Sequence, residues 1–105
     1  MISVENAKEY LRIPAEQTDE DAFVNSIIQD GYDYLRDAVD DFDEIYAENE
    51  VFARKADRYV LHFHLPTAYD EREGLGAGAE CMSYSARALM TQLSLYRKAG
   101  DNNAN

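Results

Sequence analysis

The chain has 105 residues, of which 30% are charged, and its formal net charge is −11. A chain of this length forms one domain with one small core. Such an acidic balance argues against wrapping duplex DNA through neutralised phosphates. The charge is uneven, because residues 1–50 carry 15 acidic and 3 basic residues whereas residues 51–105 carry 6 and 7. High solubility or a basic partner would explain this composition.

Other sequence signals restrict the compartment. The lone cysteine, Cys81, allows no disulfide framework within the chain and suits a reducing compartment. The N-terminus lacks the basic and apolar regions of a signal peptide. The longest apolar run, residues 59–65, is too short to span a membrane. We therefore expect a protein of the cytoplasm before any assembly.

The first half of the chain predicts two helices. Ser3 is expected to cap the first, which ends at Pro14 because proline disfavours the helical conformation of the residue before it. The second is expected to begin at Thr18, whose hydroxyl would cap it, with Asp21 at the acidic position of a capping box. Its apolar stripe extends to Phe42.

Gly31 lies inside that second helix. Glycine there costs about 1 kcal/mol relative to alanine, so its presence indicates that another helix packs closely against it. Residues 40–48 are predominantly acidic and are expected to form a link to the next helix.

The second half predicts two more helices. The third is expected from Asn49 and, because polar pairing resumes after Pro66, to continue through that proline with a kink. A Gly-rich loop follows at residues 74–78. The fourth covers residues 83–98, with Leu89 and Leu93 buried against the second and third helices. The predicted fold is all-α, a small bundle of four helices in one domain, residues 1–100, with a disordered polar tail at 101–105.

Tests for site chemistry give negative answers. The acidic run from Asp41 lacks the alternating oxygen ligands and the glycine of an EF-hand loop. His62 and His64 are two residues apart, which on a helix turns them about 200° away from each other and prevents a shared metal. The Gly-rich loop lacks the Lys-Ser or Lys-Thr of a phosphate-binding loop. We predict no metal, no cofactor and no enzymatic activity.

Two charged stripes of opposite sign are the candidate contact surfaces. The second helix carries carboxylates on one face at Asp30, Asp33, Asp37 and Asp41, and like charges at these spacings each cost about 0.2–0.5 kcal/mol. Arg54 and Arg58 share a face of the third helix. Both stripes could be plain solvated surfaces. Alternatively, the acidic face of one copy meets the basic face of the next, and such a head-to-tail contact closes into a ring.

Several short helical segments, in their order and spacing, carry a resemblance. They are residues 5–13 (ENAKEYLRI), the acid-rich start of the second helix, Lys55-Ala56 before an apolar helix that closes with residues 69–73 (YDERE), Ala88-Leu89, and Tyr96-Arg97. Over residues 1–98 the chain resembles the small head–tail connector, or head-completion adaptor, proteins of long-tailed bacteriophages and prophages. Pro14 and Pro66 depart from the pattern of that family.

The resemblance implies a structural role in the virion. Such proteins are all-α and stack as a ring, commonly of twelve copies, beneath the portal, where they extend the DNA channel and receive the next connector or tail protein. DNA would pass through without sequence-specific binding. The expected subunit interface comprises Asp30, Asp33, Asp37, Arg54, Arg58, Tyr69 and Arg72. The alternative is a small acidic DNA mimic or inhibitor that binds a basic partner.

Overall fold

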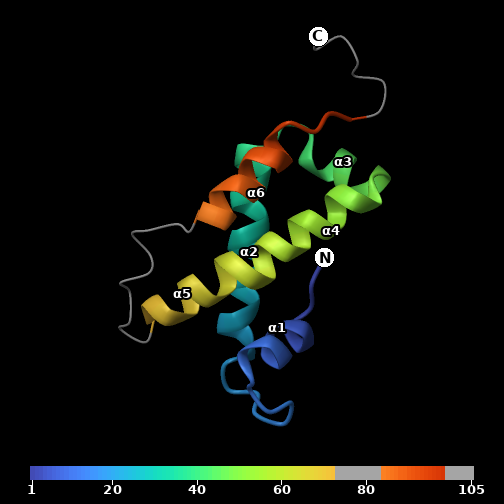
Figure 1. Cartoon of the computed structure of the whole chain (residues 1–105). Helices are drawn as coiled ribbons and strands as arrows, with labels where there is room; N and C mark the ends of the chain where they lie inside the picture. Colours follow the sequence, from blue (N-terminus) through green and yellow to red (C-terminus); the bar gives the residue numbers. More distant parts are fainter. Residues whose placement is uncertain (73–83, 99–105) are drawn as a thin grey trace.

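The computed structural model describes residues 1–72 and 84–98, and the side chains of residues 70–72 are outside this description (Figure 1). These residues form helices and no strand, which confirms the all-α class. The elements are α1 (Val4–Leu11), α2 (Asp21–Ala38), α3 (Phe42–Glu48), α4 (Glu50–Tyr59), the π-helix η1 (Val60–His64), α5 (Leu65–Arg72) and α6 (Tyr84–Ser94). The Gly-rich loop, Cys81 and the polar tail lie outside the described residues.

Helix α1 begins as predicted. The Ser3 hydroxyl accepts from the Asn6 backbone N–H at 3.1 Å, and the Asn6 side chain accepts from the Ser3 N–H at 3.0 Å. This reciprocal pair is a capping box. The helix ends at Leu11, because Arg12 takes the left-handed conformation with φ 62°.

Helix α2 begins at Asp21, not at Thr18, and Glu20 in the N-cap position makes no side-chain capping bond. The reason is the buried Lys8, which fixes the preceding loop. Its ammonium donates to the carbonyl oxygens of Ala15 at 3.0 Å and Gln17 at 2.6 Å, and it forms an ion pair with Asp21 at 2.9 Å. These bonds offset the cost of burying the charge. They also hold the loop before Asp21 outside the helix, so that α2 begins three residues later than predicted.

The expected acidic link contains a helix of its own, α3. Helix α2 ends at Ala38, and Asp41, with φ 58°, turns the chain into α3. Phe42 and Ile45 are both buried in the core, so Phe42 belongs to α3 and not to the stripe of α2. Apolar residues three apart hold this short helix down despite the acids between them.

The predicted long third helix corresponds to α4, η1 and α5, which follow one another in a single rod (Figure 1). The Asn49 side chain caps it by accepting from the Phe52 N–H at 3.0 Å. The predicted continuation through Pro66 is confirmed, but the predicted kink is not. The irregularity precedes the proline as a π-helix in which the Leu65 N–H bonds to the Val60 oxygen. Proline has no N–H for the helical bond at its own position.

Helix α2 crosses this rod (Figure 1), and Gly31 lies where the two are in contact. A Cβ atom on Gly31 would lie 3.0 Å from His64 Cδ2 and 3.1 Å from Val60 Cγ1. The prediction that another helix packs closely on this glycine is therefore confirmed.

Helix α6 packs mainly on α4 and ends at Ser94, four residues before the predicted end. Leu93 is fully buried, as expected, whereas Leu89 is only half-buried. Residues 95–98 leave the helix, and the Arg97 guanidinium donates to the Ser94 and Tyr96 carbonyl oxygens at 3.1 and 2.9 Å.

Candidate interaction surfaces

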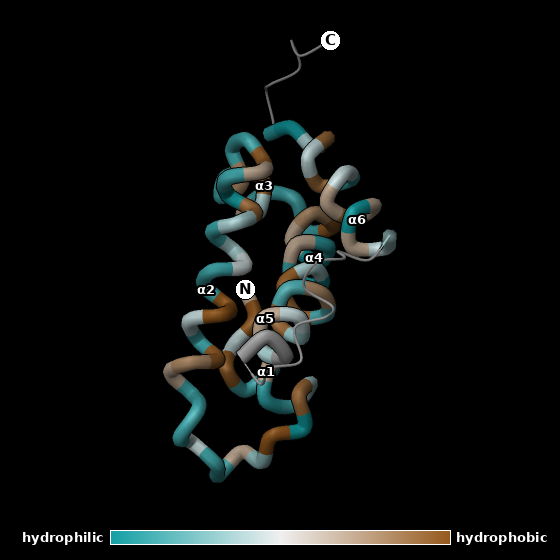
Figure 2. Tube along the Cα trace, turned by 90° about the vertical axis from the view of Figure 1, so that its left-hand side faces the viewer, coloured by the Kyte–Doolittle hydropathy of each residue, from teal (hydrophilic) through white to brown (hydrophobic). Residues whose placement is uncertain are grey.

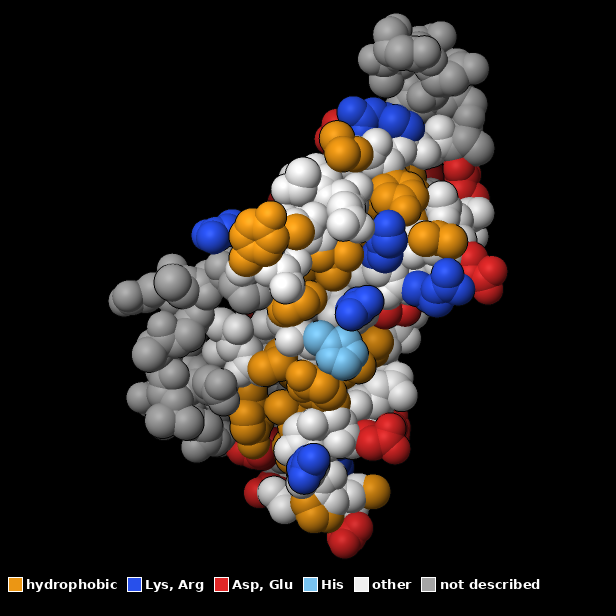
Figure 3. Space-filling view, viewed as in Figure 1, with side chains coloured by type: hydrophobic (Ala, Val, Ile, Leu, Met, Phe, Trp, Pro, Cys, Tyr) orange, Lys and Arg blue, Asp and Glu red, His pale blue; other side chains and the backbone are white. Residues whose placement is uncertain are grey.

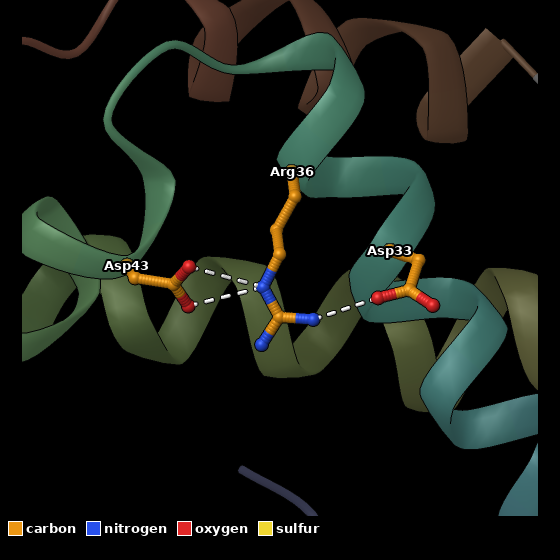
Figure 4. A network of polar contacts seen from close by, with 3 residues as sticks. All are labelled: Asp33, Arg36 and Asp43. Atoms are coloured by element: carbon orange, nitrogen blue, oxygen red, sulfur yellow. Dashed lines mark hydrogen bonds and ion pairs between the residues drawn. The ribbon is translucent and has the colours of Figure 1, made fainter.

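The acidic face lies on α2 and continues onto α3. Asp30, Asp33 and Asp37 are all exposed, as the sequence predicts. Asp33 is not free, however, because it accepts from Arg36 at 2.8 Å, and Arg36 also donates to both oxygens of Asp43 at 3.1 Å (Figure 4). The bond to Asp43 is the main reason that the pKa of Arg36 is raised.

Asp41, the last member of the predicted stripe, lies beyond the end of α2. Its carboxylate is 3.8 Å from the Lys98 ammonium, which also lies 3.5 Å from Glu44. The acidic stripe therefore has internal partners at two of its four positions. Among the described residues, Asp30 and Asp37 make no ion pair, so these are the two acids of the stripe that are available to a partner.

The basic face lies on α4 and η1. Arg54 and Arg58 are exposed one helical turn apart, and His62 continues the line one turn later. Neither arginine forms an ion pair within the part of the chain that the structure describes. Basic and hydrophobic side chains gather on this side of the molecule, and acidic ones lie mostly at its edges (Figure 3).

The two charged faces point in opposite directions. Helix α2 lies behind α4 in Figure 1, and in the turned view of Figure 2 α2 lies on one side and α4 and α6 on the other. The close-up of the Asp33–Arg36–Asp43 network shows α4 passing behind it (Figure 4). One molecule can therefore offer its acidic face to one neighbour and its basic face to another.

Tyr69 and Arg72 complete the predicted interface set. Tyr69 is half-buried and is engaged within the chain, because its hydroxyl donates to Glu20 at 2.6 Å and its ring lies 6.3 Å from that of Phe23. These contacts hold α5 against the start of α2. The side chain of Arg72 lies outside the described part of the structure.

A polar cluster that the sequence did not predict joins four segments. The Tyr32 hydroxyl donates to Asp57 at 2.6 Å and accepts from the Ile2 N–H at 2.9 Å, and the Tyr46 hydroxyl donates to the same carboxylate at 2.9 Å. Burial, followed by the bond to Asp57, raises the pKa of both phenols well above the usual 10. Burial also raises the pKa of Tyr59 to about 12. These phenols therefore stay protonated, and the hydroxyls of Tyr32 and Tyr46 tie the four segments together.

The two histidines differ in position, as predicted. His62 is exposed, and its ring meets that of Tyr10 edge-on at 4.8 Å. His64 is half-buried and packs against Gly31. Over residues 1–72 and 84–98 no group of three or more His, Cys, Asp or Glu side chains is placed to hold a metal ion. None of the helices in these ranges has the length and apolar character needed to cross a membrane.

Comparison with known proteins identifies no similar protein. No protein-family model, no curated protein and no solved structure matches the chain.

Proposed function

We propose that this chain is a head–tail connector of a long-tailed bacteriophage or prophage, a structural virion protein that assembles as a ring under the portal. The observation that carries the proposal is the pair of oppositely charged faces on opposite sides of an all-α domain. The segments that resemble connector proteins, among them residues 5–13 and 69–73, support it. In this role the ring extends the DNA channel and receives the next connector or tail protein.

The ring contact joins the acidic face of one copy to the basic face of the next. Arg54 and Arg58 pair with the acids that lack an internal partner, Asp30 and Asp37. Each exposed pair contributes only about 0.2–1 kcal/mol, but the contact repeats at every subunit of a closed ring. The carboxylates that remain exposed would repel phosphates and let DNA slide past without tight binding.

Charge reversal tests the contact. The variant Arg54→Glu with Arg58→Glu is expected to fold but to lose ring formation, measured by light scattering and negative-stain images of concentrated protein. Adding Asp30→Lys and Asp37→Lys should restore part of the assembly. A control with the same net charge, Arg12→Glu with Arg87→Glu, alters two exposed arginines, one directly after α1 and one on α6, and should assemble normally.

Salt provides a second readout, because charges more than about 8–10 Å apart are screened at physiological ionic strength. Assembly of the unaltered protein should weaken as salt is raised. Assembly of the double Glu variant at the same concentration as the unaltered protein would refute the assigned contact. Failure to bind an isolated portal ring, together with failure to form rings, would refute the connector role.

The alternative function is that of an acidic DNA mimic or inhibitor. It is favoured by the row of exposed carboxylates that extends from α2 to α3, namely Asp30, Asp33, Asp37, Asp40, Asp43 and Glu44. A mimic would stay a monomer or dimer at high concentration and would bind a basic protein in competition with DNA. Molecular mass in concentrated solution therefore separates the two functions.

A further inference from the structure

An apolar depression lies beside the basic face, between α4 and the end of α6. It has a volume of about 360 Å³ and is lined by Lys55, Gln92, Leu95 and Tyr96. The Lys55 ammonium lies 5.4 Å from the centre of the Tyr96 ring and donates to its hydroxyl at 3.2 Å. This contact holds the two sides of the depression, α4 and the segment after α6, in place. Leu95 is 70% exposed, a large apolar surface to leave in water.

A large, partly exposed aromatic side chain lies on α2, next to the acids without internal partners. Tyr34 is 46% exposed and is held in place by stacking on the buried Tyr59, with the ring centres 6.3 Å apart and the planes at 13°. On helix α2, Asp30 is four residues before Tyr34 and Asp37 three residues after it, so both are its neighbours on the helix surface.

We propose that Tyr34 of one copy inserts into the Lys55–Gln92–Leu95–Tyr96 depression of the next copy and is the energetic centre of the subunit contact. This inference rests on the self-association proposed above. Charge complementarity identifies the occupant as a second copy, because the tyrosine is flanked by Asp30 and Asp37 and the depression lies beside Arg54 and Arg58.

The contact has the composition of an interface hot spot. Binding energy at protein interfaces concentrates in a few central residues, with tyrosine and arginine enriched, while the surrounding contacts exclude water. Tyr34 loses little conformational freedom on docking, because its ring is already stacked in the free molecule. The flanking charges would set orientation and association rate more than affinity.

Disulfide trapping tests the placement while leaving Tyr34 and Leu95 intact. In a Cys81→Ser background, one sample carries Ala38→Cys, one turn from Tyr34, and a second carries Gln92→Cys. Mixing them under mild oxidation should give a covalent dimer within minutes. Ala22→Cys, at the other end of α2 and also exposed, is the matched control and should crosslink at least tenfold more slowly with Gln92→Cys.

Substitution then separates the ring of Tyr34 from its hydroxyl. Tyr34→Ser is expected to weaken association at least tenfold in sedimentation equilibrium, and Tyr34→Phe to retain it. Tyr10→Ser removes a similarly exposed tyrosine that contacts η1 and should leave association unchanged. Leu95→Ser, on the other side of the contact, should match Tyr34→Ser.

The outcomes distinguish the two proposals. If Tyr34→Ser associates like the unaltered protein while reversal of Arg54 and Arg58 prevents association, the docking of Tyr34 is wrong and the charged contact stands. Equal crosslinking of Ala38→Cys and Ala22→Cys would also refute the docking. If the unaltered protein stays monomeric at high concentration and low salt, both the docking and the self-associating connector are refuted.

Discussion

The part of the rod formed by α4 and η1 is packed differently on its two sides. On the side of α2, the missing side chain of Gly31 admits Val60 and His64, and Tyr32 is tied to Asp57. On the side of α6, Leu93 is buried but Leu89 is half-buried and Leu95 is exposed. The first contact is closed and specific, whereas the second ends in an open apolar edge. The packing of α2 against α4 therefore defines the fold, whereas α6 contributes an exposed apolar surface.

The largest effect is expected where the closed contact is overfilled. Gly31→Leu places a Cβ about 3 Å from His64 and Val60 and adds further carbons beyond it, so it should lower the free energy of unfolding by about 3 kcal/mol. Chemical denaturation measures the loss. Ala38→Leu, an addition at an exposed position of the same helix, should change the stability by less than about 0.5 kcal/mol. Equal stability of the two variants would contradict the described crossing.

A smaller loss is expected on the open side. Leu93→Ala should cost about 2 kcal/mol, the lower end of the range for buried leucines, because α6 has few neighbours and can settle into the vacated space. Leu89→Ala should cost about half as much, since Leu89 is half-buried. Thermal melts of both variants test the order. A greater loss from Leu89→Ala would mean that α6 is rotated relative to this description.

Removing the hydrogen bonds between α2 and α4 should lower the stability by a still smaller amount. Tyr32→Phe removes one bond to Asp57 and the acceptor of the Ile2 N–H, which should cost about 1 kcal/mol. Tyr46→Phe is the related variant, because Tyr46 donates to the same carboxylate from a half-buried position, and it should cost less. Urea denaturation at neutral pH compares them, and a neutral Tyr32→Phe variant would show that the tie is not stabilising.

The same tyrosines predict a loss of stability at alkaline pH. Their unfolded pKa is about 10, and in the folded chain the pKa of Tyr59 is about 12 and those of Tyr32 and Tyr46 are also raised. The folded state therefore binds more protons above pH 10, so stability is complete below pH 10 and declines as the pH rises toward 12. Melting curves at pH 8, 10 and 11 measure this decline, which should be shallower for Tyr32→Phe. A flat profile would contradict the burial of these phenols.

The smallest effect is expected at the exposed network. Asp43→Asn weakens the bonds to Arg36 but should change the stability by about 0.5 kcal/mol or less, because surface ion pairs contribute little. Asp40→Asn, a nearby exposed acid, is the matched control for lost charge. A loss above about 1 kcal/mol for Asp43→Asn alone would show that this network fixes the α2–α3 turn.

The sequence predicted what depends on neighbours along the chain. The cap at Ser3, the start of the third helix at about Asn49 and the close packing at Gly31 follow from local spacing and from the helix cost of glycine. The start of α2 could not be predicted, because Lys8 sets it from a distance through carbonyl oxygens of the loop. Helix α3 was hidden because its acids outweigh Phe42 and Ile45 in composition.

The candidate surfaces divide in the same way. The exposure of Asp30, Asp37, Arg54 and Arg58 follows from helical periodicity. The pairing of Arg36 with Asp43 depends on the reversal of the chain between α2 and α3, and the tie between Tyr32 and Asp57 joins residues 25 apart in sequence. Periodicity alone does not show which of several acids on one face is already occupied by a neighbouring arginine.

The π-helix η1 changes the direction in which the side chains of the rod point. An α-helix advances about 100° for each residue, so the extra residue that η1 takes into its turn rotates every side chain of α5 by about that angle relative to α4. The rod can therefore face α6 and α2 with one set of residues at its start and still direct Tyr69 to Glu20 at its end. In an uninterrupted α-helix of the same length, the residues that face α2 and α6 would stay on the same side of the helix from its start to its end.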